Sequence, residues 1–157
     1  MLFNGIGEKA LLAAPMTAFF ASRQCPGSAI RATMDWALQQ AKAHQVVISG
    51  FHSPLERSVL EVLLTADAPA VLALVQDPVR VRLPAPWKQA AQRGTLAIIG
   101  PATVHGRLTA ETASERNDWV AAMASQIIIA HAVPAGALPI QMERWRADGR
   151  TIVVLSP

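Results

Sequence analysis

Short apolar runs alternate with amphipathic segments along the chain, and the clearest example spans residues 16–53. An apolar run at 16–21 is followed by a polar turn at 22–27 and a segment whose apolar residues recur every three to four positions. A second apolar run at 45–49 then ends in a polar turn at 50–53. This pattern predicts a strand–helix–strand unit. Because such crossovers are nearly always right-handed, both turns should lie at one edge of a parallel sheet.

The same alternation continues to the end of the chain. Further apolar runs at 70–75, 96–99, 126–130 and 151–155 are separated by segments with helical spacing. We therefore predict an α/β protein: one domain over residues 1–157, with a three-layer, doubly wound Rossmann-like fold and a mainly parallel six-stranded sheet. The long connection from Gly100 to Ser114 predicts that strand order reverses between the first and fourth of these strands.

Less regular segments are harder to assign to elements. Residues 2–5 form a short apolar stub, and residues 79–83 fit either an edge strand or an extended loop. Helix starts are expected at Ser28, at the capping box from Ser53 to Glu56, and at a second capping box from Thr112 to Glu115. The tryptophans at 36, 87 and 145 are expected in packing positions.

Composition limits the class of protein. Hydrophobic residues make up 52% of the chain and charged residues 16%, which suits a sheet covered on both faces. The net charge of +3 permits a phosphate-bearing partner without requiring one. The single cysteine, Cys25, excludes an internal disulfide. Because the sequence shows neither a signal peptide nor an apolar run of about 20 residues, we expect a cytoplasmic protein without membrane association.

Candidate chemistry collects in the loops that should border the crevice. Ser22, Arg23 and Gln24 precede a helix, where free N–H groups and the helix dipole favour an anion; an ordinary turn with a solvated arginine explains them equally well. Arg116 should share the inward side of its helix with Trp119, so an anion explains it better than packing does. Asn117 lies beside it as a donor or acceptor. We expect Arg23, Arg116 and three helix N-termini to converge on one phosphate.

The other loops contribute weaker candidates. Gly50, Phe51 and His52 form the second turn, and Phe51 is a candidate for stacking on a nucleobase because a turn offers it little to pack against. His131 directly follows a strand, although a surface role suits either histidine. The last candidates, Gly136 and Ala137, would let an anion approach the backbone.

No cofactor motif is present in the sequence. It contains neither the Gly-x-Gly-x-x-Gly fingerprint nor a phosphate loop ending in Lys-Ser/Thr, and no cysteine–histidine cluster with metal-ligand spacing. We therefore expect no cofactor, no metal and no catalytic residue.

Several short motifs, in order along nearly the whole chain, resemble the Rossmann-like core of the DNA-processing protein A family (DprA, also called Smf). They are Leu2-Phe3-Asn4-Gly5, Ala21-Ser22-Arg23, Ser49-Gly50, Arg116-Asn117-Asp118, Ala124-Ser125, Ala135-Gly136-Ala137 and Gly149-Arg150-Thr151-Ile152-Val153-Val154. The family pattern has Gly where this chain has Ala21, a second Arg where it has Asp118, and an Ala-Arg-Gly-Ile-Asp turn where it has His52-Ser53-Pro54-Leu55-Glu56.

The resemblance implies non-enzymatic binding of single-stranded DNA by Ser22, Arg23, Arg116, Asn117 and Gly136. It also implies loading of the recombinase RecA, dimerisation and a role in natural transformation. We expect a stand-alone core with two groove arginines fewer than the family has. Two alternatives stay open: a sensor of a free nucleotide, and a hydrolase similar to the cytokinin-activating phosphoribohydrolases. The turn Pro134-Ala135-Gly136-Ala137 lacks the paired glycines and the glutamate of the latter.

Overall fold

The computed structural model describes residues 2–102 and 107–155, so part of the predicted connection from Gly100 to Ser114 lies outside the described residues. In chain order, the strands are β1 (Phe3–Gly7), β2 (Met16–Phe20), β3 (Val46–Ser49), β4 (Ala70–Ala73), β5 (Leu96–Pro101), β6 (Gln126–Ile129) and β7 (Ile152–Val154). The helices are η1 (Lys9–Ala13, a 3-10 helix), α1 (Gly27–Lys42), α2 (Pro54–Thr65), α3 (Ala85–Arg93), α4 (Ala110–Met123) and α5 (Leu138–Ala147).

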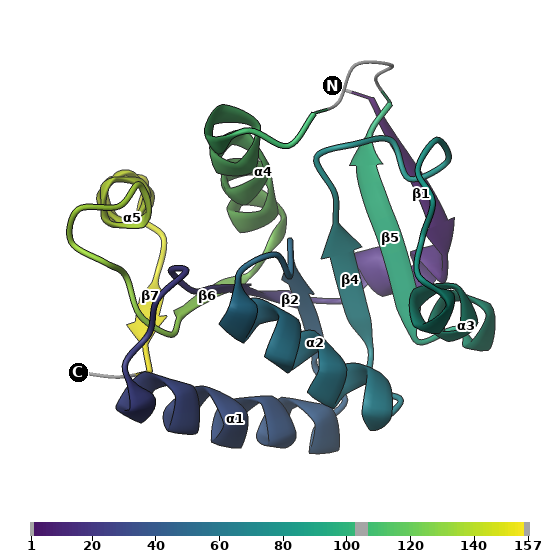
Figure 1. Ribbon diagram of the computed structural model, residues 1–157, viewed down its shortest axis with the longest axis horizontal. Helices are drawn as coiled ribbons and strands as arrows, with labels where there is room; N and C mark the ends of the chain where they lie inside the picture. The colour runs from purple at the N-terminus through teal and green to yellow at the C-terminus, as the bar shows by residue number, and fades with distance from the viewer. Residues whose placement is uncertain (1, 103–106, 156–157) are drawn as a thin grey trace.

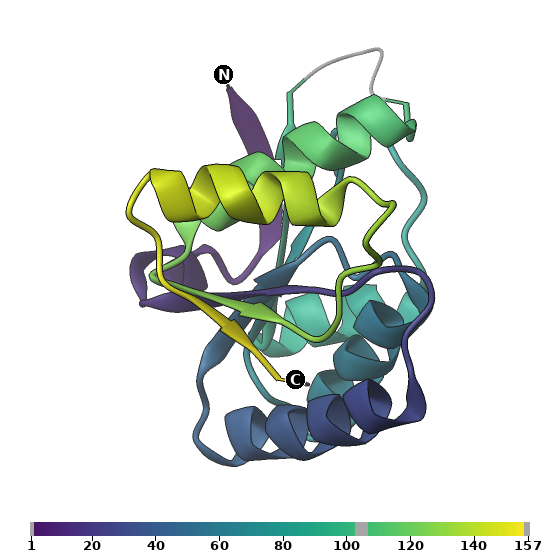
Figure 2. The ribbon, with the colours of Figure 1, turned by 90° about the vertical axis from the view of Figure 1, so that its left-hand side faces the viewer.

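Helices cover both faces of the sheet. The core on one face includes side chains of α1, α2 and α3, and the core on the other includes side chains of α4 and α5 (Figures 1 and 2). Adjacent residues of a strand serve opposite cores: Phe19 packs with Trp36 of α1, and Phe20 packs with Trp145 of α5. Burial on both faces explains why the strands are apolar throughout, and the predicted three-layer Rossmann-like fold is confirmed.

The order of the strands differs from the prediction. The seven described strands follow the order β1-β5-β4-β3-β2-β6-β7, so β2 lies between β3 and β6, and β5 is not its neighbour. The predicted reversal between the first and fourth predicted strands was therefore wrong. Since α3 packs on the same face as α1 and α2, each right-handed crossover adds the next strand on the same side. α4 packs on the opposite face of the sheet, and the strand that follows it, β6, pairs with β2 on the side away from β3.

The N-terminal stub forms a seventh strand. β1 pairs antiparallel with β5, from Phe3 opposite Pro101 to Gly7 opposite Ala97, while the other pairs in the sheet are parallel. Residues 79–83 form a turn and loop and not an edge strand. Among the described helices, none is long and apolar enough to span a lipid bilayer.

The helix starts agree with the prediction in one case out of three. α2 begins as expected after Ser53, whose N–H donates to Glu56 Oε1 at 3.2 Å. α1 begins at Gly27 with Pro26 in the cap position, so Ser28 is already inside the helix. α4 begins one turn earlier than predicted. Its capping residue is Thr109, whose Oγ1 accepts the N–H of Thr112 at 3.1 Å.

Candidate functional site

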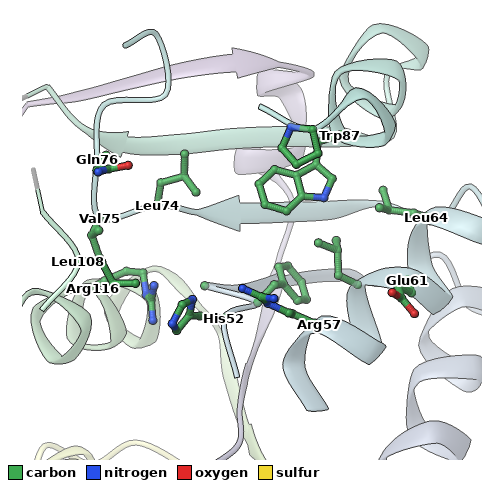
Figure 3. A pocket seen from close by; sticks show the side chains of 14 residues that line it. His52, Arg57, Glu61, Leu64, Leu74, Val75, Gln76, Trp87, Leu108 and Arg116 are labelled. Carbon is green, nitrogen blue, oxygen red and sulfur yellow. The ribbon is translucent and has the colours of Figure 1, made fainter. Parts of the chain in front are cut away.

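Two hollows lie side by side at the carboxyl edge of the parallel strands. The first, here called the Arg116 pocket, has a volume of about 400 Å³, and its lining includes Gly50, Phe51, His52, Arg57, Trp87 and Arg116 (Figure 3). The second, here called the Ser22 pocket, has a volume of about 450 Å³, and its lining includes Ser22, Arg23, Gln24, Asn117, Gly136 and Ala137. The loops after β2 and β6 meet at the Ser22 pocket, which is therefore where strand order reverses.

The two hollows divide the predicted site. Arg23 lines the Ser22 pocket, whereas Arg116 lines its neighbour, so the expectation that both arginines reach one anion position was wrong. Asn117 lines the Ser22 pocket beside Arg116 in sequence, and its Oδ1 accepts hydrogen bonds from Arg116 Nε and Nη2, at 3.4 Å each. These two residues join the hollows. His131 lines neither; its backbone carbonyl accepts the N–H of Ser22 at 3.0 Å.

Arg116 reaches the site from α4 and lies against the backbone of Gly50. Its side chain is inward, as predicted, and the residue is only 6% exposed. A Cβ on Gly50 would lie 2.5 Å from Arg116 Nε and 2.7 Å from its Nη1. Only glycine leaves room for the guanidinium in this position, so Gly50 places the charge.

Within the part of the chain that the structure describes, Arg116 forms no ion pair. Its hydrogen bonds to Asn117 are long, and a guanidinium has five N–H donors. Burial lowers the pKa of Arg116, and the nearby Glu56 carboxylate offsets part of this shift. A buried charge without a close partner is costly, so an anion entering the pocket would find a guanidinium that is already desolvated and positioned.

Glu56 supports the site by holding two loops together. Its Oε2 accepts the N–H of Ala21 at 3.0 Å, and its Oε1 accepts the N–H groups of His52 and Ser53 at 3.0 and 3.2 Å. The residue is 5% exposed. Its capping role was visible in the sequence, but the bond to Ala21, which ties the end of β2 to the loop after β3, was not.

His52 shares the Arg116 pocket and is half-buried. Its pKa is lowered from 6.5 by burial first, and then by the positive charges of Arg116, Arg57 and Arg23, against the opposite effect of Glu56. Its imidazole is therefore neutral at pH 7. An anion in the pocket would reverse the local charge and favour the protonated form.

Phe51 does not behave as the sequence suggested. It is 2% exposed and packs in the core on the side of α1, α2 and α3, so the idea that it lacks packing partners and stacks on a nucleobase was wrong. Its φ of +47° is uncommon for a bulky residue. The Oγ of Ser49 accepts the N–H of Phe51 at 3.0 Å, which stabilises this tight exit from β3.

Hydrogen bonds to backbone N–H groups join the loops that form the Ser22 pocket. Ser22 Oγ accepts the N–H of Val133 at 2.8 Å, which joins the loops after β2 and β6. We expected an anion to approach the backbone of Gly136. Its N–H instead donates to the carbonyl of Val133 at 2.9 Å. Of the three helix N-termini predicted to converge here, those of α4 and α5 line the pocket, through Ala110 and Leu138.

Sequence reasoning missed two residues of the Arg116 pocket. Arg57 lies in the first turn of α2, and Trp87, which was assigned to packing, is half-buried near the start of α3. α2 follows β3 closely, so its first turn lies at the carboxyl edge of the sheet, and a basic residue there was the signal that could have revealed Arg57. Residues 74–84 separate α3 from β4, so the position of Trp87 depends on the path of that connection and had no such signal.

The aspartate at the family's second arginine position faces another helix. Asp118 accepts hydrogen bonds from Gln141 Nε2, Arg144 Nη2 and Trp145 Nε1, at 3.0 to 3.3 Å. Asp118 therefore links α4 to α5 and makes an interhelical contact at this position.

No protein-family model matches the sequence, and neither does any curated protein. Among solved structures, DNA processing protein A from Streptococcus pneumoniae is similar with a TM-score of 0.77 and 18% identity, over 97% of this chain and 54% of that one. The Helicobacter pylori protein, described with its single-stranded DNA binding mode, has a TM-score of 0.77 and 17% identity, over 97% of this chain and 70% of that one.

A more distant likeness is to the Moco carrier protein of Chlamydomonas rheinhardtii, with a TM-score of 0.54 and 8% identity over 89% of this chain and 74% of that one. The chain spans about half the length of the pneumococcal protein. The TM-scores of 0.77 over 97% of this chain lead to one conclusion: this chain has the fold of the DprA Rossmann-like core.

Proposed function

We propose that this protein binds single-stranded DNA, or a nucleotide, at the carboxyl edge of its sheet without chemically altering it. The observation that carries the proposal is the buried guanidinium of Arg116, held against Gly50 and without an ion-pair partner among the described residues. A phosphate supplies the charge and the oxygen acceptors that this group lacks. The fold of the single-stranded DNA-binding neighbour from Helicobacter pylori supports DNA as the first ligand to test.

The surroundings of Arg116 suit an anion more than a neutral ligand. Arg57 and His52 line the same pocket, and Arg23 lines the adjoining one. The nearest buried carboxylate, Glu56, is engaged by three backbone N–H groups. A phosphate on Arg116 would therefore meet mostly positive or neutral groups.

Fluorescence anisotropy with a labelled oligothymidylate, followed by competition with free nucleotides, tests the proposal. Arg116→Ala should weaken binding by about 1.5–3 kcal/mol, the range for hydrogen bonds to charged groups. The matched control is Arg146→Ala, which removes an equal charge from an exposed position of α5 that lines neither pocket. Thermal melting should show both variants folded.

If Arg116→Ala binds every oligonucleotide and nucleotide as the parent does, the site is misassigned. If nucleotides displace the oligonucleotide completely and bind more tightly, the protein is a nucleotide sensor. Loading of RecA, self-association and a role in DNA uptake or recombination are further proposals that rest on the DprA resemblance alone.

A further inference from the structure

The Arg116 pocket has a polar end and an apolar end. In Figure 3 the side chains of Arg116, His52 and Arg57 lie along one side, and Trp87 lies across the pocket from them. The lining also includes apolar side chains such as Leu64 and Leu74. A phosphate alone makes no favourable contact with apolar side chains, whereas a nucleoside with its phosphate matches both the basic and the apolar parts.

The carboxylate in the lining strengthens this polarity. Glu61 lies at the end of the pocket that is farther from Arg116 in Figure 3. A phosphate is therefore attracted to the Arg116 end and repelled from the other, which leaves the apolar part of the pocket for a base. The volume of about 400 Å³ falls within the usual range of small-ligand sites.

The second hollow begins where the phosphate would lie. Arg116 lines one pocket, Asn117 lines the other, and the two side chains are hydrogen-bonded to each other. A phosphate at this junction would therefore have space for a substituent on each side. The Ser22 pocket offers the side-chain amide of Asn117 to the second substituent, whereas the amide nitrogen of Gln141 in the same lining already donates to Ser114 and Asp118.

We infer that the smallest ligand filling the site is a phosphodiester-linked pair of nucleosides. One base occupies the Arg116 pocket against Trp87, the phosphodiester lies on Arg116, and the adjoining nucleoside enters the Ser22 pocket. This inference rests on the proposed function and deepens it, because it favours a nucleic-acid strand over a mononucleotide.

Calorimetric titration of the protein with thymidine, thymidine monophosphate and the dinucleoside monophosphate TpT tests the inference directly. The monophosphate carries about two negative charges near neutral pH and TpT one, so charge alone favours the monophosphate. With a second nucleoside bound, TpT should bind at least about fivefold more tightly than the monophosphate. Equal or tighter binding of the monophosphate would overturn the inference and leave the proposed function intact. Absence of binding by these ligands and by oligothymidylate would overturn both.

Variants of Trp87 assign the base to its pocket. Trp87→Ala should weaken TpT binding by roughly fivefold to a hundredfold, and Trp87→Phe should retain most of it, because a ring that supports a base is kept. Trp119→Ala is the matched control, since Trp119 is also half-buried but contacts Phe3 and lines neither pocket. Unchanged TpT affinity in a folded Trp87→Ala would place the base elsewhere and refute this assignment.

Discussion

Gly50→Ala is the sharpest test of how the site is built, because it changes the position of a charge without removing it. The added Cβ would lie 2.5 Å from Arg116 Nε, where ordinary contact begins at 3.4 Å. The guanidinium must therefore move by about 1 Å. A charge-assisted hydrogen bond to phosphate is about 2.7–2.9 Å long, so such a shift breaks it. The loss should be about 1.5–3 kcal/mol, or roughly tenfold to 150-fold in Kd.

The fold should tolerate the same change. Gly50 is not among the glycines with positive φ, so alanine can adopt its backbone conformation. The atoms that must yield are the end of a flexible side chain, and alanine also restricts the unfolded chain, which contributes about 0.4–1 kcal/mol of stability. We therefore expect a melting temperature within a few degrees of the parent, together with the loss of oligonucleotide binding by anisotropy.

Gly27→Ala is the matched control for this experiment. An added Cβ there meets nothing within 4 Å, and its φ is likewise not positive. The control should bind like the parent. A Gly50→Ala protein that is folded and keeps parental affinity would show that Arg116 does not bind phosphate in the observed position.

Four further predictions concern the charged groups of the site. Arg116→Met should weaken binding as Arg116→Ala does, yet raise the free energy of unfolding by roughly 1 kcal/mol in urea denaturation, because it removes an unpaired buried charge; marked destabilisation would contradict this. Since burial and then Arg116 and Arg57 lower the pKa of His52 below 6.5 against Glu56, a bound anion should raise that pKa, so ligand binding should take up a proton. Affinity should therefore rise as pH falls from 8 to 6 in the parent but not in His52→Ala. Because the pKa of His52 is lower in the folded protein than in the unfolded chain, its contribution to stability is present above pH 6.5 and is lost as pH falls through the lowered pKa. On acidification from pH 6.5, the melting temperature should therefore fall less in His52→Ala than in the parent. With Arg23 and Arg116 as the main contacts, two or three phosphates should be neutralised, so log K against log salt should have a slope of about −1.4 to −2.1, and a much steeper slope would reveal other arginines.

The sequence by itself determined the elements and the edge at which the site lies. Runs such as Val46–Ser49 are apolar because both faces of the sheet are covered. Each such strand can therefore be recognised from its own residues, without knowing what packs against it. Right-handed crossovers then place the loops after parallel strands at one edge. For this reason the sequence alone was enough to predict that Arg23 and Gly50 lie at the same edge of the sheet.

Strand order was decided only by the tertiary structure. Whether β5 continues outward from β4 or returns to β2 depends on which face α3 covers, and an amphipathic helix packs equally well on either. The antiparallel pairing of β1 with β5 depends on that choice, because it uses the edge that β5 leaves open.

The division into two pockets was also decided by long-range packing. Arg116 turns towards Gly50 because a residue much earlier in the chain lacks a Cβ, and Phe51 enters the core because β3 ends in a left-handed turn. Neither position is indicated by the spacing of apolar residues in the sequence. Periodicity reports which side of an element is buried, whereas the position of a side chain within a site depends on contacts between segments that only the folded chain brings together.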